Sequence, residues 1–307
     1  MISIIVCSIS PSRLEELKKN IKATIGNDTE YEVIGFDNRT EALPIAAVYN
    51  KCAAIAEGNN LFFLHEDIKF KESGWGRTIE EKLEEEDCGV LGFAGSIIKT
   101  SALSGWAINI ETERSHYWYI DDNGRERLCN VNMPEGTDFS RVVTLDGCGM
   151  AVKKTVHDKW PFDETMLTGF HSYDLDYTME IAKHCKNYCC HIEVLHMSNG
   201  SFDDKWVSST IRMHNEKWYK FLPLYIPEAN FSKKELDRLN AITMWSFFKA
   251  AYKSGSFYTI PIFKQFASLP FSMWHTGKVI DGCWKLLIRK KHKDARKTKQ
   301  LYSNTNV

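Results

Sequence analysis

The residues best suited to chemistry follow a short apolar run. Residues 61–64 are all apolar, which is typical of a strand buried on both faces of a parallel sheet, and His65, Glu66 and Asp67 come next. Open α/β sheets bind ligands at the carboxyl ends of such strands. Carboxylate oxygens there suit Mg²⁺ or Mn²⁺, and such a metal would in turn hold a diphosphate. The alternative interpretation is a strand followed by an ordinary polar turn.

Acidic and imidazole side chains also stand at other expected strand and helix ends. Asp37 follows an expected strand over residues 31–36, and His196 follows one over residues 188–195. Because parallel strands end at one edge of their sheet, these side chains can share a cleft with the cluster at 65–67. Asp174 and Asp176 stand where a loop enters an expected helix over residues 175–185. An Asp there is either a helix cap or a general base aimed into the same cleft.

The alternation of strands and helices that positions these residues predicts an α/β fold. Apolar runs at 2–7, 31–36 and 61–64 are typical of strands, and apolar residues at helical spacing predict helices between them. This order gives a doubly wound, mostly parallel sheet flanked by helices. Further strands are expected at 90–95 and 141–145. A hairpin or excursion from the sheet is expected between residues 106 and 132, with its turn at 122–124.

The bulk composition is that of a soluble globular protein. The 307 residues are 43% hydrophobic and 26% charged, and the net charge is −1, which argues against a nucleic-acid partner. No window reaches the roughly 18 apolar residues that a spanning helix needs, and the start lacks the pattern of a signal peptide. We therefore expect a cytoplasmic protein, either free or peripheral at the inner face of the cell membrane.

The cysteines do not form a recognisable framework. There are nine of them, and an odd number cannot all pair. Cys185, Cys189 and Cys190 lie close to His184 and His191 in the sequence, but this spacing fits none of the usual zinc patterns. Since buried free cysteines are common in apolar stretches, we expect reduced thiols, as is usual in the cytosol.

Taken together, the motifs resemble a known family. In chain order they are Asp37, Tyr49-Asn50, Phe63 to Asp67, Asp146-Gly147, Phe162-Asp163-Glu164, Gly169 to Asp176 and His196. Each motif is loose, and the order and spacing carry the signal. This series is similar to the family-2-type bacterial glycosyltransferases of the GT-A fold, in the branch with a His-x-Asp form of the Asp-x-Asp motif. The resemblance implies a GT-A-like nucleotide-sugar-binding and catalytic domain over residues 1–223.

That family resemblance implies an activity. It is the transfer of a sugar, with inversion, from a nucleotide-sugar (UDP-linked) to a saccharide or lipid-linked acceptor in surface polysaccharide synthesis. Mn²⁺ or Mg²⁺ would neutralise the departing diphosphate as a Lewis acid. A positioned carboxylate would take the proton of the attacking hydroxyl.

Carried over position by position, the resemblance gives the motif residues their roles. Asp174 matches the general base. Asp67 and His196 match ligands of the metal, and His65 stands at the first position of the metal motif. Apart from the resemblance, residue chemistry offers further candidates: His171 contacts donor or acceptor, or else bonds within its loop, and Trp75, Trp106 and Trp206 stack on sugars or pack in a core, with His171 and Trp106 the acceptor candidates. The residues implied to contact the donor are Ser8, Asp37, His65, Asp67, Asp146 and Gly147.

Two departures from the family pattern keep a second class of function open. His65 replaces the usual first Asp of the metal motif, and Tyr173 stands where an acidic partner of Asp174 is usual. The rival is a catalytically inactive protein that keeps the fold and binds a sugar or nucleotide as a scaffold. Binding of a uridine diphosphate without transfer would favour that rival.

The last third of the chain, residues 224–307, predicts a helical, aromatic-rich extension with a basic tail. Residues 241–252 and 257–274 are rich in Phe, Trp, Tyr and Met, and Arg289, Lys290 and Lys291 follow an apolar stretch that contains Trp284. Aromatic residues beside a basic cluster are typical of a helix that lies in a membrane interface. The alternative is a helical extension packed on the main domain with a solvated tail.

Overall fold

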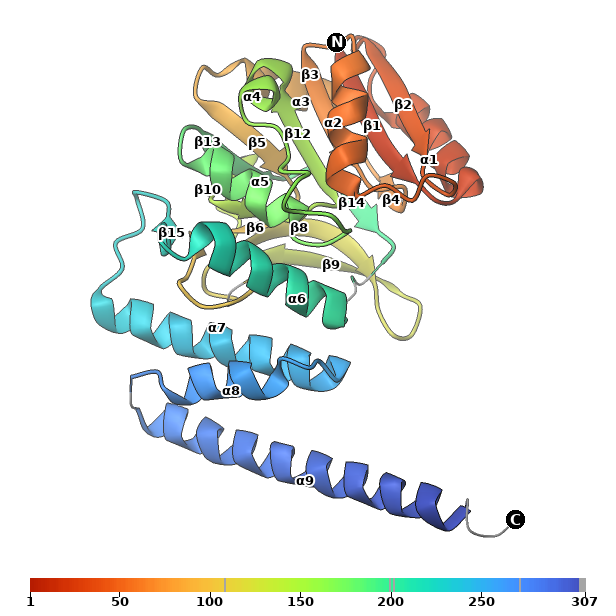
Figure 1. Ribbon diagram of the computed structural model, residues 1–307. Coiled ribbons are helices and arrows are strands. Elements are labelled where there is room, and N and C mark those ends of the chain that lie inside the picture. Colours follow the sequence, from red (N-terminus) through yellow and green to blue (C-terminus); the bar gives the residue numbers. More distant parts are fainter. Residues whose placement is uncertain (108, 199, 201, 271, 304–307) are drawn as a thin grey trace.

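Two large β-sheets, a two-stranded ribbon and a stack of helices make up the protein (Figure 1). The computed structural model describes residues 1–303 without 108, 199, 201 and 271, and it describes side chains only up to residue 288. The strands are β1 (Ile2–Ser8), β2 (Tyr31–Asp37), β3 (Asn60–Leu64), β4 (Ile68–Phe70), β5 (Cys88–Gly92), β6 (Ala94–Ser96), β7 (Ile98–Lys99), β8 (Glu113–Ile120), β9 (Glu126–Val131), β10 (Phe139–Val142), β11 (Thr144–Leu145), β12 (Gly149–Lys153), β13 (Lys186–Cys190), β14 (Val194–His196) and β15 (Leu224–Tyr225). The helices are α1 (Pro11–Thr24), α2 (Ile45–Ile55), α3 (Trp75–Glu84), α4 (Lys154–Lys159), α5 (Tyr173–Ala182), α6 (Asp204–Met213), a π-helical turn (His214–Trp218), α7 (Lys233–Ser254), α8 (Thr259–Ala267) and α9 (Met273–Ser303).

The first sheet confirms the expected fold class. Its strand order is β10-β13-β5-β12-β3-β1-β2. β1, β2, β3, β5 and β13 run in one direction, and β10 and β12 run against them. The protein is therefore α/β, with a mostly parallel sheet whose neighbouring parallel strands are joined through helices.

Helices cover both faces of this sheet, as the apolar run in β3 predicted. Leu61 and Phe63 belong to one core, together with buried residues of α2 and α5. Phe62 and Leu64 belong to the other, with buried residues of α1 and α3. Because successive strand residues point to opposite faces, an uninterrupted apolar run is what a strand between two helical layers requires.

Three stretches that were expected to be single strands are instead broken, and each passes from the first sheet into the second. Residues 90–95 divide into β5 and β6, residues 141–145 into β10 and β11, and residues 188–195 into β13 and β14. The second sheet has the order β11-β6-β8-β14-β4, with β9 paired to β8. A Cβ atom at Gly95 would lie 2.1 Å from the carbonyl oxygen of Thr144, so glycine is needed where β6 meets β11. Periodicity alone does not show such breaks, since both halves of each stretch are apolar.

The aromatic region between residues 106 and 132 is confirmed as a hairpin only in its second part. β8 and β9 pair around a turn at the expected place, where the Gly124 N–H donates to the Asp121 carbonyl at 2.9 Å. Trp106 lies in a loop rather than a strand, and Ile108, which the expectation also included, lies outside the described residues. The loop places Trp106 at the wall of a cavity instead of in the sheet.

The C-terminal helices share a core with the rest of the molecule. In Figure 1, α7, α8 and α9 lie in succession below α6 and the sheets. Ala102 and Leu103, from the loop after β7, are buried with Val207 of α6 and with apolar residues of α7 and α8. The Ala102 N–H also donates to the side-chain oxygen of Asn240 on α7, at 3.2 Å. In the part of the chain that the structure describes, no helix is long and apolar enough to cross a membrane.

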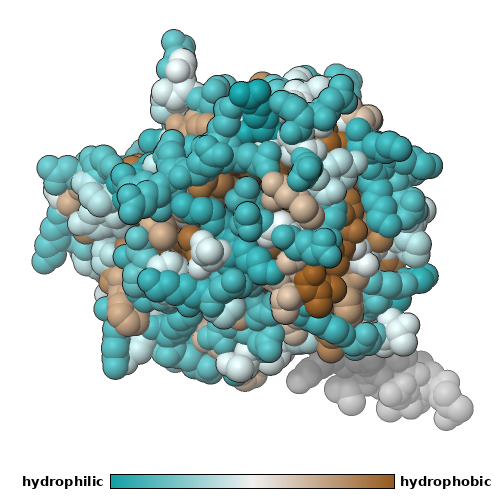
Figure 2. Space-filling model, turned by 90° about the horizontal axis from the view of Figure 1, so that it is seen from above, coloured by the Kyte–Doolittle hydropathy of each residue, from teal (hydrophilic) through white to brown (hydrophobic). Residues whose placement is uncertain are grey.

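A strip of α9 leaves large apolar side chains uncovered. Met273, Ile280, Trp284 and Leu287 recur along one side of the helix and are between 57% and 94% exposed. Val279, by contrast, packs against the core shared by α7 and α8. The view from above in Figure 2, onto the sheets, shows a mainly hydrophilic face with apolar side chains only in patches between polar ones. The basic residues 289–291 lie beyond the residues whose side chains are described.

A buried ion pair ties α5 to the π-helical turn. Asp176 is 2% exposed, and its carboxylate accepts from the indole N–H of Trp218 at 2.7 Å and from the ammonium of Lys217 at 2.9 Å. Lys217 is 27% exposed and also lies 3.6 Å from a carboxylate oxygen of Glu180, so loss of Asp176 would chiefly leave the buried indole N–H of Trp218 without its acceptor. Asp176 is thus a structural residue, although it lies two positions from Asp174.

We expect Asp176→Ala to lower the free energy of unfolding by about 1–3 kcal/mol, since the buried indole N–H of Trp218 loses its acceptor. Urea unfolding followed by circular dichroism measures the change. Glu15→Ala is the matched control: it removes the carboxylate of an exposed pair with Lys18, and the unfolding midpoint should stay near that of the wild type. Equal effects of the two substitutions would contradict the prediction.

Candidate functional site

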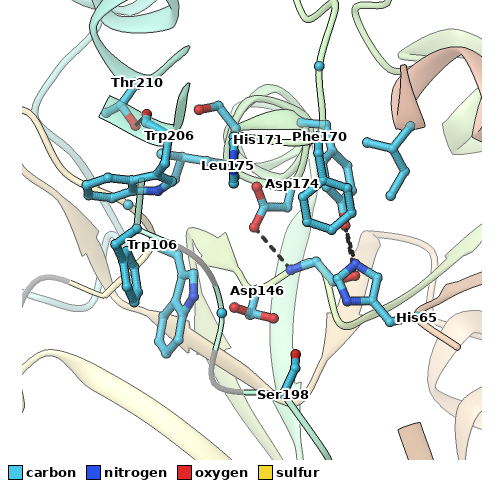
Figure 3. Close-up of a pocket in the computed structure, with 18 of the residues that line it drawn as sticks. His65, Trp106, Asp146, Phe170, His171, Asp174, Leu175, Ser198, Trp206 and Thr210 are labelled. Carbon is cyan, nitrogen blue, oxygen red and sulfur yellow. Dashed lines mark hydrogen bonds between the residues drawn. The ribbon is translucent and has the colours of Figure 1, made fainter. Parts of the chain in front are cut away.

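One cavity of about 830 Å³ gathers most of the predicted site residues. In Figure 3, His65 lies on one side of the cavity, Trp106 and Trp206 lie on the other, and Asp146 and Asp174 lie between them. The wall is built by the ends of β3 and β14, by the loops around residues 104–107, 146–147 and 168–175, and by α6 and α7. The cleft lies at the carboxyl end of β3, where a parallel sheet is expected to bind ligands.

At one end of the cavity, His65, Asp67 and His196 form a candidate metal centre. Their potential ligand atoms all lie within 4.8 Å of one another. Asp67 Oδ1 lies 4.0 Å from His65 Nδ1 and 3.6 Å from His196 Nε2, and it is buried with no hydrogen-bond partner among the described residues. A buried carboxylate oxygen without a donor is costly unless a cation compensates it. Two imidazoles and one carboxylate fit a divalent metal such as Mn²⁺.

The strand register explains how Asp67 and His196, 129 positions apart, reach this centre. β14 pairs antiparallel with β4, so that His196 lies opposite Ile68. The Met197 N–H donates to the Asp67 carbonyl at 3.0 Å. The metal centre thus depends on the second sheet, which the sequence did not reveal.

Tyr173, one of the two departures from the family pattern, orients His65. The Tyr173 hydroxyl lies 2.7 Å from His65 Nε2 and donates to the Gly147 carbonyl at 3.1 Å. If the phenol proton is directed to Gly147, the contact with His65 places a proton on Nε2. That tautomer leaves the Nδ1 lone pair on the side of Asp67, as a metal ligand requires. Burial, with His196 nearby, lowers the pKa of His65, which favours the same neutral form.

A second possible donor set shares His196 but is chemically weaker. Asp146, Cys148 and His196 also bring ligand atoms within 4.8 Å of one another. Burial raises the pKa of the Cys148 thiol well above its usual value, and the thiolate is the form that binds metals. The set containing Asp67 is therefore the better fit.

Asp174 has the environment of a general base. The Gly147 N–H donates to its Oδ2 at 3.1 Å and fixes the carboxyl group at the cavity wall. Burial, with the neighbouring carboxylate of Asp146, raises the pKa of Asp174 to about 7. A carboxyl group whose pKa lies near 7 is suited to accept a proton in a reaction at physiological pH.

Gly147 can only be a glycine in this arrangement. A Cβ atom there would lie 2.2 Å from the Tyr173 hydroxyl and 2.9 Å from Asp174 Cβ. The preceding residue, Asp146, accepts from the Cys148 N–H at 2.9 Å, which closes a tight turn around Gly147. The entrance to α5 also has an unusual backbone conformation: Ser172, the residue just before the helix, has a left-handed φ of 68°.

Glu66 points away from the metal centre. Its Oε2 accepts from the Ser8 hydroxyl at 2.6 Å and from the N–H groups of Ile9 and Ser10 at 3.2 and 3.1 Å. Glu66 thereby fixes the turn between β1 and α1, which brings Ile9 and Arg13 to the cavity.

Two residues expected to contact the donor have other partners. Ser8 donates its hydroxyl to Glu66. Asp37 is paired at the surface with Arg39 at 2.6 Å, and its neighbour Asn38 lines the cavity. The contact of Ser8 and Asp37 with a donor remains a prediction.

The residues proposed for the acceptor lie at the cavity. His171 lines it, and its Nε2 lies 3.5 Å from Asp203 Oδ1, so both roles considered for it remain open. Trp106 and Trp206 line the cavity as well, and both are partly exposed. Trp75, by contrast, is a core residue stacked on Phe70 with ring centroids 3.9 Å apart.

Sequence reasoning missed part of the wall. Among the missed residues are Arg13, Asn38, Ser104, Phe170 and the residues of α7, namely Thr243, Ser246, Phe247 and Ala250. Arg13 could have been suspected, because the turn after the first strand of such a sheet commonly faces a phosphate. No local pattern marks the α7 residues, which read as one face of a buried helix.

Comparison with known proteins assigns the chain to a family. Residues 3–221 match the glycosyltransferase-like family. The chain belongs to this family. The assignment confirms the expected resemblance and the class of enzyme, whereas the His-x-Asp form of the metal motif remains a prediction. No curated protein matches this glycosyltransferase-like chain.

Several solved structures are similar to this glycosyltransferase-like chain at low identity. Crystalline GalNAc-T7 with UDP, GalNAc and Mn²⁺ is 9% identical over 86% of this chain and 56% of its own, with a TM-score of 0.49. The mannosyltransferase PcManGT from Pyrobaculum calidifontis, in complex with GDP-Man and Mn²⁺, is 12% identical over 93% of this chain and 84% of its own, with a TM-score of 0.47. TarS of S. aureus is 13% identical over 95% and 91%, with a TM-score of 0.47.

The metal centre can be tested by thermal unfolding in the presence of Mn²⁺. Mn²⁺ should raise the melting temperature of the wild-type protein, since a ligand at 100 times its Kd adds about 2.7 kcal/mol to the free energy of unfolding. Asp67→Asn should abolish most of the shift, because it removes the central anionic ligand.

Two control variants make the result specific to this centre. Asp37→Asn removes an exposed carboxylate elsewhere, and Cys148→Ala removes the thiol of the second donor set; both should keep the Mn²⁺ shift. A full Mn²⁺ shift in Asp67→Asn, or loss of the shift in Cys148→Ala, would show that the metal is not held by the assigned residues.

Proposed function

We propose that the protein is an inverting, metal-dependent glycosyltransferase that moves a sugar from a UDP-linked donor to a saccharide or lipid-linked acceptor in bacterial surface polysaccharide synthesis. The observation that carries this proposal is a single cavity that holds two different groups. One is an uncompensated carboxylate between two imidazoles, and the other is a separately tuned carboxyl group at Asp174. Transfer of a sugar from a diphosphate needs a cation at the leaving group and a base at the attacking group.

The chain's own residues account for the proton and for orientation. The acceptor oxygen forms a bond to the anomeric carbon as the bond to the diphosphate oxygen breaks, and the hydroxyl proton passes to Asp174. Gly147 holds that carboxylate in place through its N–H. His65, Asp67 and His196 would hold the metal, which when bound supplies charge compensation for the diphosphate. With base and leaving group on opposite sides, attack proceeds in line and inverts the anomeric centre.

The raised pKa of Asp174 sets the direction of the pH dependence. Only the carboxylate accepts a proton, so kcat/KM should fall about tenfold per pH unit below pH 7 and level off above it. The effect on stability is opposite. The folded state binds this proton more tightly than the unfolded state does. The bound proton therefore stabilises the fold at pH values below the usual Asp pKa, and this stabilisation is lost as the pH rises through 7.

We expect Asp174→Asn to lower transfer by about 10²–10⁴-fold, since it removes the base. Asp67→Ala should abolish metal-dependent transfer. Both are measured by release of UDP from a panel of UDP-sugars with Mn²⁺. Asp174→Asn should also melt at a higher temperature than wild type at pH 8, an advantage that shrinks toward pH 4, because it removes the cost of a buried carboxylate.

Two outcomes would count against the proposal. Full activity in both variants would refute the assigned roles. Tight UDP binding by wild type with no turnover of any donor would favour the inactive scaffold instead.

We also propose that the exposed strip on α9 contacts an anionic membrane surface. Met273, Ile280, Trp284 and Leu287 form the apolar side, and the sequence continues at once into Arg289 and further basic residues. An amphipathic helix of this kind gains affinity from buried apolar area and from attraction to anionic lipid. A lipid-linked acceptor would be met at the same surface.

Trp284→Glu should reduce co-sedimentation with vesicles of phosphatidylglycerol and phosphatidylcholine, because it places a charge in the apolar strip. Ile55→Glu, which changes a comparably exposed apolar residue on α2, is the control and should bind as wild type does. Binding that survives Trp284→Glu, or that is equal on pure phosphatidylcholine, would contradict a contact of this chemistry.

A further inference from the structure

The end of the cavity away from the metal centre is walled by the C-terminal extension. Thr243, Ser246, Phe247 and Ala250, all on α7, line the same cavity as His65 and Asp174. They face residues 104–107 from the loop after β7 and Trp206 from α6. This end of the wall is uncharged, because its described lining residues are all aromatic, aliphatic, glycine or hydroxyl-bearing.

Two indoles give this end an aromatic surface. Figure 3 places Trp106 and Trp206 beside each other, across the cavity from His65. Trp206 is held by Phe247 and Phe202, each with ring centroids 5.1 Å away, and by Gly105, where a Cβ atom would lie 3.5 Å from the indole. Rigid, half-exposed tryptophans combine apolar area with a polar N–H, which suits the apolar face and hydroxyl rim of a sugar ring.

Two buried hydroxyl groups in this wall lack a partner. Ser104 is 5% exposed and Thr243 is 1% exposed, and neither side-chain oxygen has a hydrogen-bond partner among the described residues. A helical threonine ordinarily bonds to the carbonyl one turn earlier. Leaving such a group unpaired costs about 1–3 kcal/mol. The two oxygens are themselves covered in this conformation, and a rotation about χ1 that turns them to a hydroxyl-bearing ligand in the cavity would remove the cost.

The wall is held rigidly before any ligand arrives. Ala102 is fixed at both backbone groups: its N–H donates to Asn240 of α7 at 3.2 Å, and its carbonyl accepts from Lys99 Nζ at 2.6 Å. Lys99 is fully buried and also donates to the Thr100 carbonyl at 3.1 Å. The loop that carries Ser104 and Trp106 is therefore positioned by α7, and pre-organisation of this kind favours binding.

We propose that α7 completes an acceptor subsite for a neutral sugar, which stacks on Trp106 and Trp206 and bonds to the hydroxyls of Ser104 and Thr243. This rests on the proposed function: with the diphosphate at His65, Asp67 and His196, in-line attack brings the acceptor from the other side of Asp174, where these residues lie (Figure 3). The extension is then part of acceptor recognition and not only an attachment to a surface.

The test is saturation-transfer NMR on the full chain with methyl β-glycosides of glucose, galactose and N-acetylglucosamine, and with methyl β-glucuronide as the acidic counterpart. At least one neutral glycoside should bind and the glucuronide should not. Thr243→Val should weaken that binding about fivefold or more, which corresponds to one lost hydrogen bond. Thr276→Val, the same substitution on α9 outside the cavity, should leave it unchanged.

Melting temperature separates a binding role from a structural one. Thr243→Val should melt at or above the wild-type temperature without ligand, because it removes an unpaired buried hydroxyl. A lower melting temperature in step with lost binding would overturn the proposal, and so would binding that is indifferent to Thr243→Val or the absence of binding by any neutral glycoside.

Thermal shift with UDP and Mn²⁺ on the same samples distinguishes failure of this inference from failure of the proposed function. An intact UDP shift without glycoside binding overturns the acceptor subsite alone. Glycoside binding that depends on Thr243 without any UDP shift supports the sugar subsite and rejects the transferase.

Discussion

The site depends on the close approach of Tyr173 to the backbone of Gly147. From one glycine, the N–H holds the base and the carbonyl receives the phenol that aligns His65. A side chain at position 147 would push away both Tyr173 and Asp174. Base and metal centre are thereby fixed relative to one another, and a fixed separation between the two is what a displacement reaction requires. Other parts of the fold serve this contact: α5 presents Tyr173 and Asp174, and the turn into β12 presents Gly147.

Carboxylates close together in the sequence have different roles in this site, because residues one or two positions apart point in different directions at a strand end and on a helix alike. Glu66 and Asp67 are adjacent, yet one fixes the turn after β1 and the other faces two imidazoles. Asp174 and Asp176 lie two positions apart on α5, yet one is at the cavity and the other anchors Trp218 and Lys217. Residue type alone did not distinguish the members of either pair; the partner of each carboxylate does.

The sequence predicted the parts of the site that come from regular elements. Asp67 at the end of a buried run and Asp174 at a helix entrance followed from strand and helix patterns, and His196 was expected at a strand end, although in a different sheet. The breaks between β5 and β6 and between β13 and β14 were missed, because hydrophobic pattern records burial and not the sheet to which a strand belongs. The α7 wall was missed for a related reason: its place in the cavity depends on how distant elements pack.

The shared core of α7 and the loop after β7 bears on engineering this protein. Residues 99–106 and the extension form one unit through Lys99, Ala102 and Asn240. A chimera that exchanges only the chain after residue 223 would therefore break this unit. The Ala102 N–H would lose the acceptor that the Asn240 side chain on α7 supplies. A chimera that exchanges residues 99–106 together with the extension keeps these contacts. These two segments should therefore be exchanged together in order to change acceptor preference.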